Sequence, residues 1–154
     1  MNAHSHDTIV RSIDIAAPPE RVWSSLTDHR AFGTWFRVAL DQPFVPGRET
    51  TGAMTYPGHE GTPWRSVTEI MEAPRRFVFR WPHGVGKDTD GAAHDGEVWT
   101  TVEFRLEPIA TGTRVTVTES GFSALPEAAR VAAIRGNTEG WEIQTGNLRD
   151  HAEG

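Results

Sequence analysis

One acidic residue lies where it could act inside the molecule. Glu119 follows Thr113, Val115 and Val117 at every second position, and this alternation sends side chains to the buried face of a strand. We therefore expect the Glu119 carboxyl group to point inward. Burial raises the pKa of an unpaired carboxyl group, so Glu119 is the candidate acid, base or ligand-orienting residue. The competing interpretation is a strand-end carboxylate that pairs with an arginine or is exposed at a cavity mouth.

Large aromatic rings fall on stripes that should face the same interior. The chain has six Trp and seven Phe but one Tyr, and such rings bind flat apolar molecules by dispersion and stacking. The candidates for lining a cavity are Trp35, Phe79, Trp81 and Trp141, with simple core packing as the alternative for each. Asn137 lies one helical turn before Trp141. Because a buried amide needs a partner, it bonds either the sheet or the polar group of a ligand.

Other reactive residue types do not predict a site. No two of the seven histidines have the helical or hairpin spacing that places two imidazoles on one metal. Without cysteine there is no thiolate nucleophile or Cys-ligated zinc, and we expect neither a metal nor a cofactor. Residues 83–96 contain GVGKDT and DTDG, which do not complete a phosphate loop or a calcium loop. We interpret them as a hairpin connection and hypothesise that it covers the cavity mouth.

Composition limits the class of protein. The 154 residues suffice for one domain over residues 1–154, with residues 1–7 as a flexible tail. Fifteen Lys and Arg against twenty-one Asp and Glu give a net charge of −6, which disfavours nucleic-acid binding. No apolar run approaches the ~20 residues that span a bilayer, and the N-terminus lacks the regions of a signal peptide. These features predict a cytoplasmic protein without membrane insertion.

Hydrophobic patterns predict an antiparallel sheet and three helices. Strands are expected near residues 9–15, 49–56, 64–72, 75–82, 97–107 and 112–120. Both faces of 64–72 carry apolar groups, so its inward face stays open. Short helices are expected after Pro18–Pro19, since proline suits the first helical turn, and over about 28–36. A final helix is expected over about 126–149.

The final helix carries an underfilled apolar stripe. Its inner positions are predicted to be Val131, Ile134, Trp141 and Leu148, joined by Asn137, Thr138 and Thr145. Gly136, Gly140 and Gly146 interrupt it, each less favourable than Ala by up to ~1 kcal/mol in a helix. Either the helix backbone approaches a sheet closely, or the missing side chains leave a void. A curved sheet around such a helix is an α+β architecture that naturally makes a ligand cavity.

Several segments, in order along the chain, resemble one known family. They are IDIAAPPERVWSSLTD (13–28), FGTWF (32–36), PFVPG (43–47), VTEIMEAPRRFVFRW (67–81), TTVEFRLEP (100–108), TRVTVTESGF (113–122) and NTEGW (137–141). Together they resemble the START-like (SRPBCC, helix-grip) superfamily, in the branch named for the activator of heat-shock protein 90 ATPase. The resemblance implies a roughly seven-stranded antiparallel sheet around a C-terminal helix, enclosing an apolar cavity. Relatives bind lipids, polyketides or other hydrophobic molecules, and a minority catalyse cyclisation or dehydration.

The leading hypothesis is a domain that binds a hydrophobic small molecule between the sheet and the final helix. Glu119 and Asn137 would orient the polar end of that ligand. One alternative is a cyclase or dehydratase that uses Glu119 as acid or base. Another is a stress-response module that binds a heat-shock protein 90 homologue, although the chain has no room for the additional domain of the eukaryotic co-chaperone. Whether the partner is a second copy of the chain or a chaperone stays open.

Overall fold

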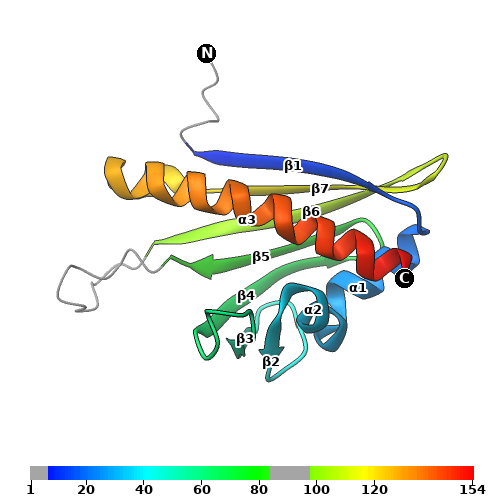
Figure 1. The fold of residues 1–154 in the computed structure, drawn as a ribbon, viewed down its shortest axis with the longest axis horizontal. Helices are drawn as coiled ribbons and strands as arrows, with labels where there is room; N and C mark the ends of the chain where they lie inside the picture. The colour runs from blue at the N-terminus through cyan, green and yellow to red at the C-terminus, as the bar shows by residue number, and fades with distance from the viewer. Residues whose placement is uncertain (1–6, 84–97) are drawn as a thin grey trace, which may run out of the picture.

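A seven-stranded antiparallel sheet forms most of the computed structural model, which describes residues 7–83 and 98–154 (Figure 1). The strands are β1 (Thr8–Ile15), β2 (Val38–Leu40), β3 (Glu49–Met54), β4 (Pro63–Glu72), β5 (Arg76–Pro82), β6 (Trp99–Ile109) and β7 (Gly112–Ser120). Their order in the sheet is β1-β7-β6-β5-β4-β3-β2. The helices are α1 (Pro19–Thr27), α2 (His29–Phe36) and α3 (Glu127–Glu153), with a 3-10 turn η3 (Phe122–Ala124) before α3.

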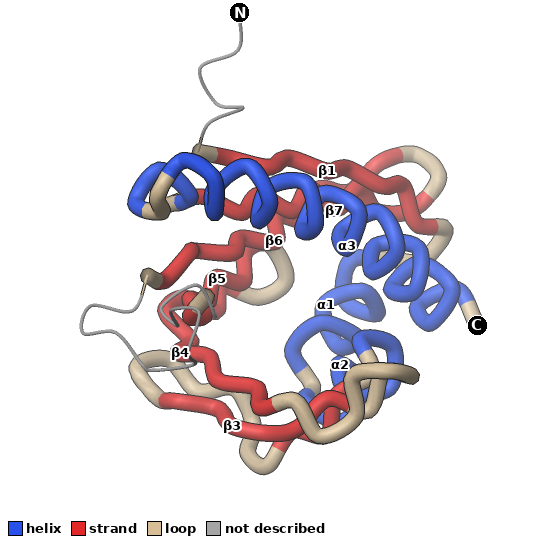
Figure 2. The backbone as a smooth tube through the Cα atoms, turned by 60° about the vertical axis from the view of Figure 1, so that its left-hand side comes forward, coloured by secondary structure: helices blue, strands red, loops and turns tan. Residues whose placement is uncertain are grey.

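The curved sheet holds α3 along one face. Figures 1 and 2 show α3 running lengthwise over the sheet, with α1 and α2 on the same side near its C-terminal end. α3 packs against β1, α1, α2 and η3. The expected α+β helix-grip architecture, with two short helices after the first strand, is confirmed.

Local alternation correctly predicts which strand residues face inward. On β7, Val115, Val117 and Glu119 are buried, and on β6 the even-numbered residues from Thr100 to Leu106 are buried. The antiparallel register places Glu119 opposite Val102. The inward parity expected for Glu119 is therefore confirmed.

A bulge in β4 explains why its inward face could not be chosen from the sequence. Thr68 pairs with the buried Phe79, but the register then shifts, so that Met71 pairs with the buried Phe77. Directly paired residues share a face of the sheet. The inward face is therefore even-numbered before the shift and odd-numbered after it, which no single alternation describes.

The two short helices form close to their predicted positions. Pro18 is the N-cap of α1 and Pro19 begins it. Asp28 accepts hydrogen bonds from the backbone N–H groups of Arg30 and Ala31 at the start of α2, which satisfies donors that a helix leaves unpaired. Arg37 ends α2 in the left-handed conformation, with φ 71°. β2, a three-residue strand, follows directly and is too short to produce a recognisable period.

The long helix extends beyond its predicted end and differs from the predicted stripe at two positions. α3 continues to Glu153 rather than 149. Val131 is 54% exposed, and Thr138 is also exposed, so both were wrongly assigned to the inner face. At 100° per residue, Val131 lies about 80° and Thr138 about 60° around the helix from Trp141. Both therefore fall beside the true stripe.

Asp7, the first described residue, is hydrogen-bonded to the turn that follows β7. Its carboxylate accepts hydrogen bonds from the backbone N–H and the hydroxyl of Ser123, at 3.0 and 2.6 Å. These bonds hold the pKa of Asp7 below its usual value. The entry into β1 is thus connected to the turn that leads into α3.

Candidate functional site

The carboxylate of Glu119 has no exposed surface and lies at the centre of a group of hydrogen-bonding side chains. Five side chains bond it: Trp81 Nε1 (2.8 Å), His83 Nε2 (3.3 Å), Thr100 Oγ1 (2.6 Å), Asn137 Nδ2 (3.0 Å) and Trp141 Nε1 (2.9 Å). They come from β5 and the residue after it, from β6 and from α3. The carboxylate therefore joins three strands to the long helix. We call these five residues and Glu119 the Glu119 cage.

The cage reverses the expected effect of burial on Glu119. Burial is the largest single influence and raises its pKa, but the hydrogen bonds from His83, Thr100, Trp81 and Trp141 together outweigh it and lower the pKa. The expectation of a raised pKa, which assumed an unpaired carboxyl group, is therefore wrong. The competing interpretation also fails, because Glu119 is neither exposed nor paired with an arginine among the described residues.

An ionised carboxylate held in this way is suited to anchoring rather than to proton transfer. With a lowered pKa, Glu119 holds no proton to donate at neutral pH. Its lone pairs are already engaged by the cage, since Oε1 accepts from Asn137 and Trp141 while Oε2 accepts from Trp81 and Thr100. The arrangement fixes the two indole rings and the Asn137 amide in place.

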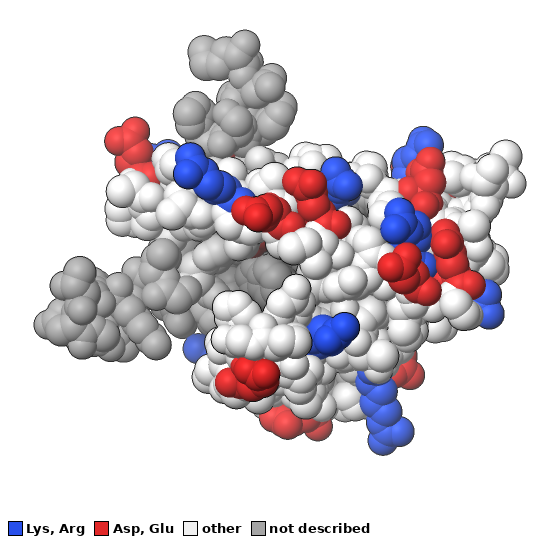
Figure 3. Space-filling model, in the orientation of Figure 1, with Lys and Arg blue, Asp and Glu red and all other residues white. Residues whose placement is uncertain are grey.

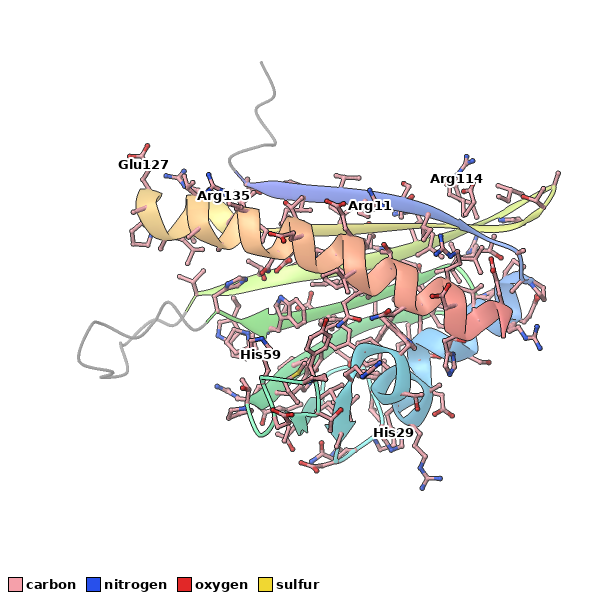
Figure 4. All side chains as sticks on the ribbon, viewed as in Figure 1. Arg11, His29, His59, Arg114, Glu127 and Arg135 are labelled. Carbon is pink, nitrogen blue, oxygen red and sulfur yellow. The ribbon has the colours of Figure 1, made fainter. Side chains whose placement is uncertain are left out.

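A pocket of about 370 Å³ lies directly beside the cage, between α3 and the sheet. Its lining residues come from α2, β3, the connection after β3, β5 and α3: Phe36, Met54, His59, Trp81, Asn137, Gly140, Trp141 and Gln144. The rings of Trp81 and Trp141 stack with centroids 5.8 Å apart. Figure 4 shows His59 on the connection between β3 and β4. No Lys, Arg, Asp or Glu is among the lining residues in the described part of the chain.

The structure brings four of the six predicted site residues together. Trp81, Asn137 and Trp141 line the pocket, and Glu119 lies behind them. Trp35 and Phe79 are instead buried in the core and are not among the lining residues. The Trp35 indole N–H donates to the carbonyl oxygen of Ser25. Trp35 and Phe79 therefore both follow the alternative interpretation of core packing.

Five lining residues were not predicted from the sequence. Gln144 lies three positions after Trp141, so helical periodicity contains a signal for it, and Gly140 is one of the gaps in the predicted stripe. Phe36 belongs to a predicted aromatic helix. Met54 and His59 carried no signal, because no local pattern shows that the end of β3 faces α3.

The glycines of α3 do not mark close approach to the sheet. A Cβ atom placed on Gly136, Gly140 or Gly146 would have no neighbour within 4 Å. Close backbone approach is therefore excluded as their explanation. Gly140 lines the pocket, so its missing side chain contributes to the open space, as the alternative explanation predicts.

Three further sequence-based predictions concern a metal site, the connection after β5 and membrane insertion. Within residues 7–83 and 98–154, no three His, Asp or Glu side chains are placed to hold a metal ion. The connection predicted to cover the cavity mouth lies, after His83, outside the described residues. None of the helices described is long and apolar enough to cross a membrane.

Comparison with known proteins identifies the family. The model of the activator of Hsp90 ATPase homolog 1-like proteins matches residues 16–153. The chain belongs to this family. The resemblance inferred from the sequence is thereby confirmed for most of the chain's length.

Several bacterial proteins of solved structure share this fold. Protein MLL2253 from Mesorhizobium loti is 22% identical, with a TM-score of 0.76 over 94% of this chain and 95% of that one. Protein NE0264 from Nitrosomonas europaea is 17% identical, with a TM-score of 0.74 over 99% and 98%. DynU16, a protein of the dynemicin biosynthetic locus, is 23% identical, with a TM-score of 0.74 over 96% of this chain but 47% of its own. At these identities the likeness shows the fold. No curated protein matches the chain.

Proposed function

We propose that this member of the activator of Hsp90 ATPase homolog 1-like family binds a hydrophobic small molecule in the pocket beside Glu119. The observation that carries the proposal is a space of about 370 Å³ between the stacked indoles and a glycine of α3. Pockets of this size, walled mostly by apolar groups with few polar ones, are typical of small-molecule sites. The family fold commonly holds hydrophobic ligands, which supports the same conclusion.

The aromatic walls supply the binding energy in this proposal. Removing ~200–300 Å² of apolar ligand surface from water contributes roughly 5–8 kcal/mol before the costs of association. Trp81 and Trp141 offer the ligand apolar ring surface, because both line the pocket and their polar N–H groups are bonded to Glu119. Glu119 therefore acts through its neighbours, keeping the walls in position, and Asn137 contacts the polar end of the ligand.

The test is to fill the pocket from the helix. Gly140→Leu places a side chain in the open space, and the same change at Gly136, one turn earlier and exposed, is the matched control. Both replace glycine with a better helix former, so both variants should fold. Nile red, a neutral dye that fluoresces in apolar surroundings, should bind the wild type and Gly136→Leu but bind Gly140→Leu at least about tenfold more weakly. Equal binding by the two variants would exclude this pocket.

The family match favours a second candidate, an interaction module for a heat-shock protein 90 homologue. Figure 3 shows acidic and basic side chains interspersed along the outer surface of α3, a surface of the mixed kind that suits a soluble partner. The purified chain should then bind the homologue and stimulate its ATPase. If a pull-down and an ATPase assay both show no effect, this candidate is eliminated.

A further inference from the structure

The amide of Asn137 has a fixed orientation in the pocket wall. Its Nδ2 donates to both oxygens of Glu119, at 3.0 and 3.2 Å. An ionised carboxylate only accepts hydrogen bonds, so the Asn137 amide nitrogen must face Glu119. The carbonyl oxygen Oδ1 therefore points away from the cage, and no donor among the described residues contacts it. It is an acceptor in the pocket wall with unused bonding capacity.

The other polar groups of the wall repeat this pattern. Gln144 donates from Nε2 to the carbonyl oxygen of Phe36, at 3.0 Å. Its Oε1 accepts one bond from Asn147, at 3.2 Å, and can accept a second. The indole N–H groups of Trp81 and Trp141 are both bonded to Glu119. Apart from the His59 imidazole and the second N–H of the Gln144 amide, the N–H donors of the described lining side chains are engaged within the protein.

The negative charge of Glu119 behind the pocket wall also favours a donor or a cation over an anion. Glu119 is ionised and buried directly behind Trp81, Asn137 and Trp141, and a second anion entering the pocket would meet it across low-dielectric surroundings. A cation would be attracted both by this charge and by the faces of the indole rings, since tryptophan is the best ring for cation–π contact. The Glu119 cage thus leaves a pocket that accepts hydrogen bonds and favours positive charge.

We infer that the ligand is an apolar molecule whose polar group donates hydrogen bonds, with a basic amine favoured over an alcohol and a carboxylate rejected. The inference rests on the proposed function and names the class of ligand for the same pocket. Asn137 Oδ1 receives the donor, and Trp81 and Trp141 cover the apolar body. The same arrangement disfavours fatty acids and other organic anions.

A matched series of ligands tests this selectivity. Methylnaphthalene, naphthylmethanol, naphthylmethylamine and naphthoate share one ring system and differ in the polar group. Their affinities are measured by displacement of Nile red at about pH 8, above the usual titration range of imidazole. The amine should bind most tightly and the alcohol next. Naphthoate should bind at least about tenfold more weakly than the amine.

The outcomes separate the inference from the proposed function. If naphthoate binds as well as the amine while methylnaphthalene also binds, the inference is wrong and the pocket still binds apolar molecules. If neither Nile red nor any naphthyl compound binds, the proposed function fails and the inference with it. Asn137→Leu should reduce the preference for the amine over methylnaphthalene, whereas Thr138→Leu, exposed on α3 and outside the lining, should preserve it. The ligand series on the wild type decides the question even if Asn137→Leu does not fold.

Discussion

Trp81 on β5 and Trp141 on α3 stack at an interplanar angle of 24° and donate their indole N–H groups to different oxygens of one carboxylate. Each ring thus has its polar edge on Glu119, and both rings line the pocket. One buried charge connects the sheet to the helix at the point where the pocket opens. The stability of the fold and the shape of the pocket therefore depend on the same group.

Replacing Glu119 should be among the most destabilising single changes in the chain. Glu119→Gln presents an amide group to side chains that donate hydrogen bonds, leaving buried donors unpaired, and such losses cost about 1–3 kcal/mol each. We expect the free energy of unfolding to fall by about 3 kcal/mol or more, measured by urea denaturation. Glu142→Gln, on the exposed face of α3, is the control and should change it by less than about 0.5 kcal/mol. A loss below about 1 kcal/mol for Glu119→Gln would contradict the anchoring role.

Acid should weaken the protein partly through Glu119. Its pKa in the folded state lies below the ordinary value of 4.5, so the folded state favours the ionised form. The resulting stabilisation is present above pH 4.5 and is lost as the pH falls through the lower folded-state pKa. The stability difference between wild type and Glu119→Gln should therefore shrink in acid.

Urea denaturation of both proteins from neutral pH down to about pH 3 measures this difference. Asp7 and Asp28 also have lowered pKa values, but they are present in both proteins and cancel in the comparison. A difference that stays constant across the range would show that Glu119 does not titrate with a lowered pKa.

The position of Glu119 could be predicted from the sequence, but its chemistry could not. Alternation along β7 is a local property, and it correctly sent the side chain inward. The direction of its pKa shift depends instead on donors from β5, β6 and α3, which lie up to 38 positions away along the chain. No local pattern shows that two indoles and an amide meet one carboxylate, so the sequence indicates the burial of Glu119 but not the hydrogen bonds that compensate for it.

The buried face of α3 could also be predicted only in part from the sequence. Its apolar type places Val131 on the inner face, yet the buried positions of α3 are Trp141, Gln144, Thr145, Leu148 and Ala152. The face that a helix turns toward the sheet depends on all of its tertiary contacts together. The gaps at the glycines, in contrast, could be recognised from the sequence. Choosing between close backbone approach and a void as their explanation required the positions of the surrounding atoms.

Two buried threonines on the inner face of the sheet should respond oppositely to the same substitution. Thr68 Oγ1 is buried with no hydrogen-bond partner among the described residues, whereas Thr100 Oγ1 donates to Glu119 at 2.6 Å. Thr68→Val should raise the free energy of unfolding by about 1 kcal/mol, because it removes an unsatisfied buried hydroxyl group. Thr100→Val should lower it by about 1.5–3 kcal/mol, the value of a hydrogen bond to a charged group. Chemical denaturation measures both, and a loss of stability for Thr68→Val would indicate that its hydroxyl has a partner.

The glycines of α3 should tolerate alanine, unlike a glycine of the sheet. Gly136→Ala and Gly140→Ala add a methyl group where no atom lies within 4 Å, and each should stabilise the helix by about 0.5–1 kcal/mol. Gly52 on β3 is the contrasting position, because a Cβ atom there would lie 2.3 Å from the carbonyl oxygen of Ala39 on β2. Gly52→Ala should therefore be destabilising, since backbone must move to admit it. Thermal unfolding distinguishes the three variants. Destabilisation by Gly140→Ala would mean that α3 packs too closely there to leave the proposed pocket. Stabilisation without loss of Nile red binding would show that the pocket has room for the ligand and for the added methyl group.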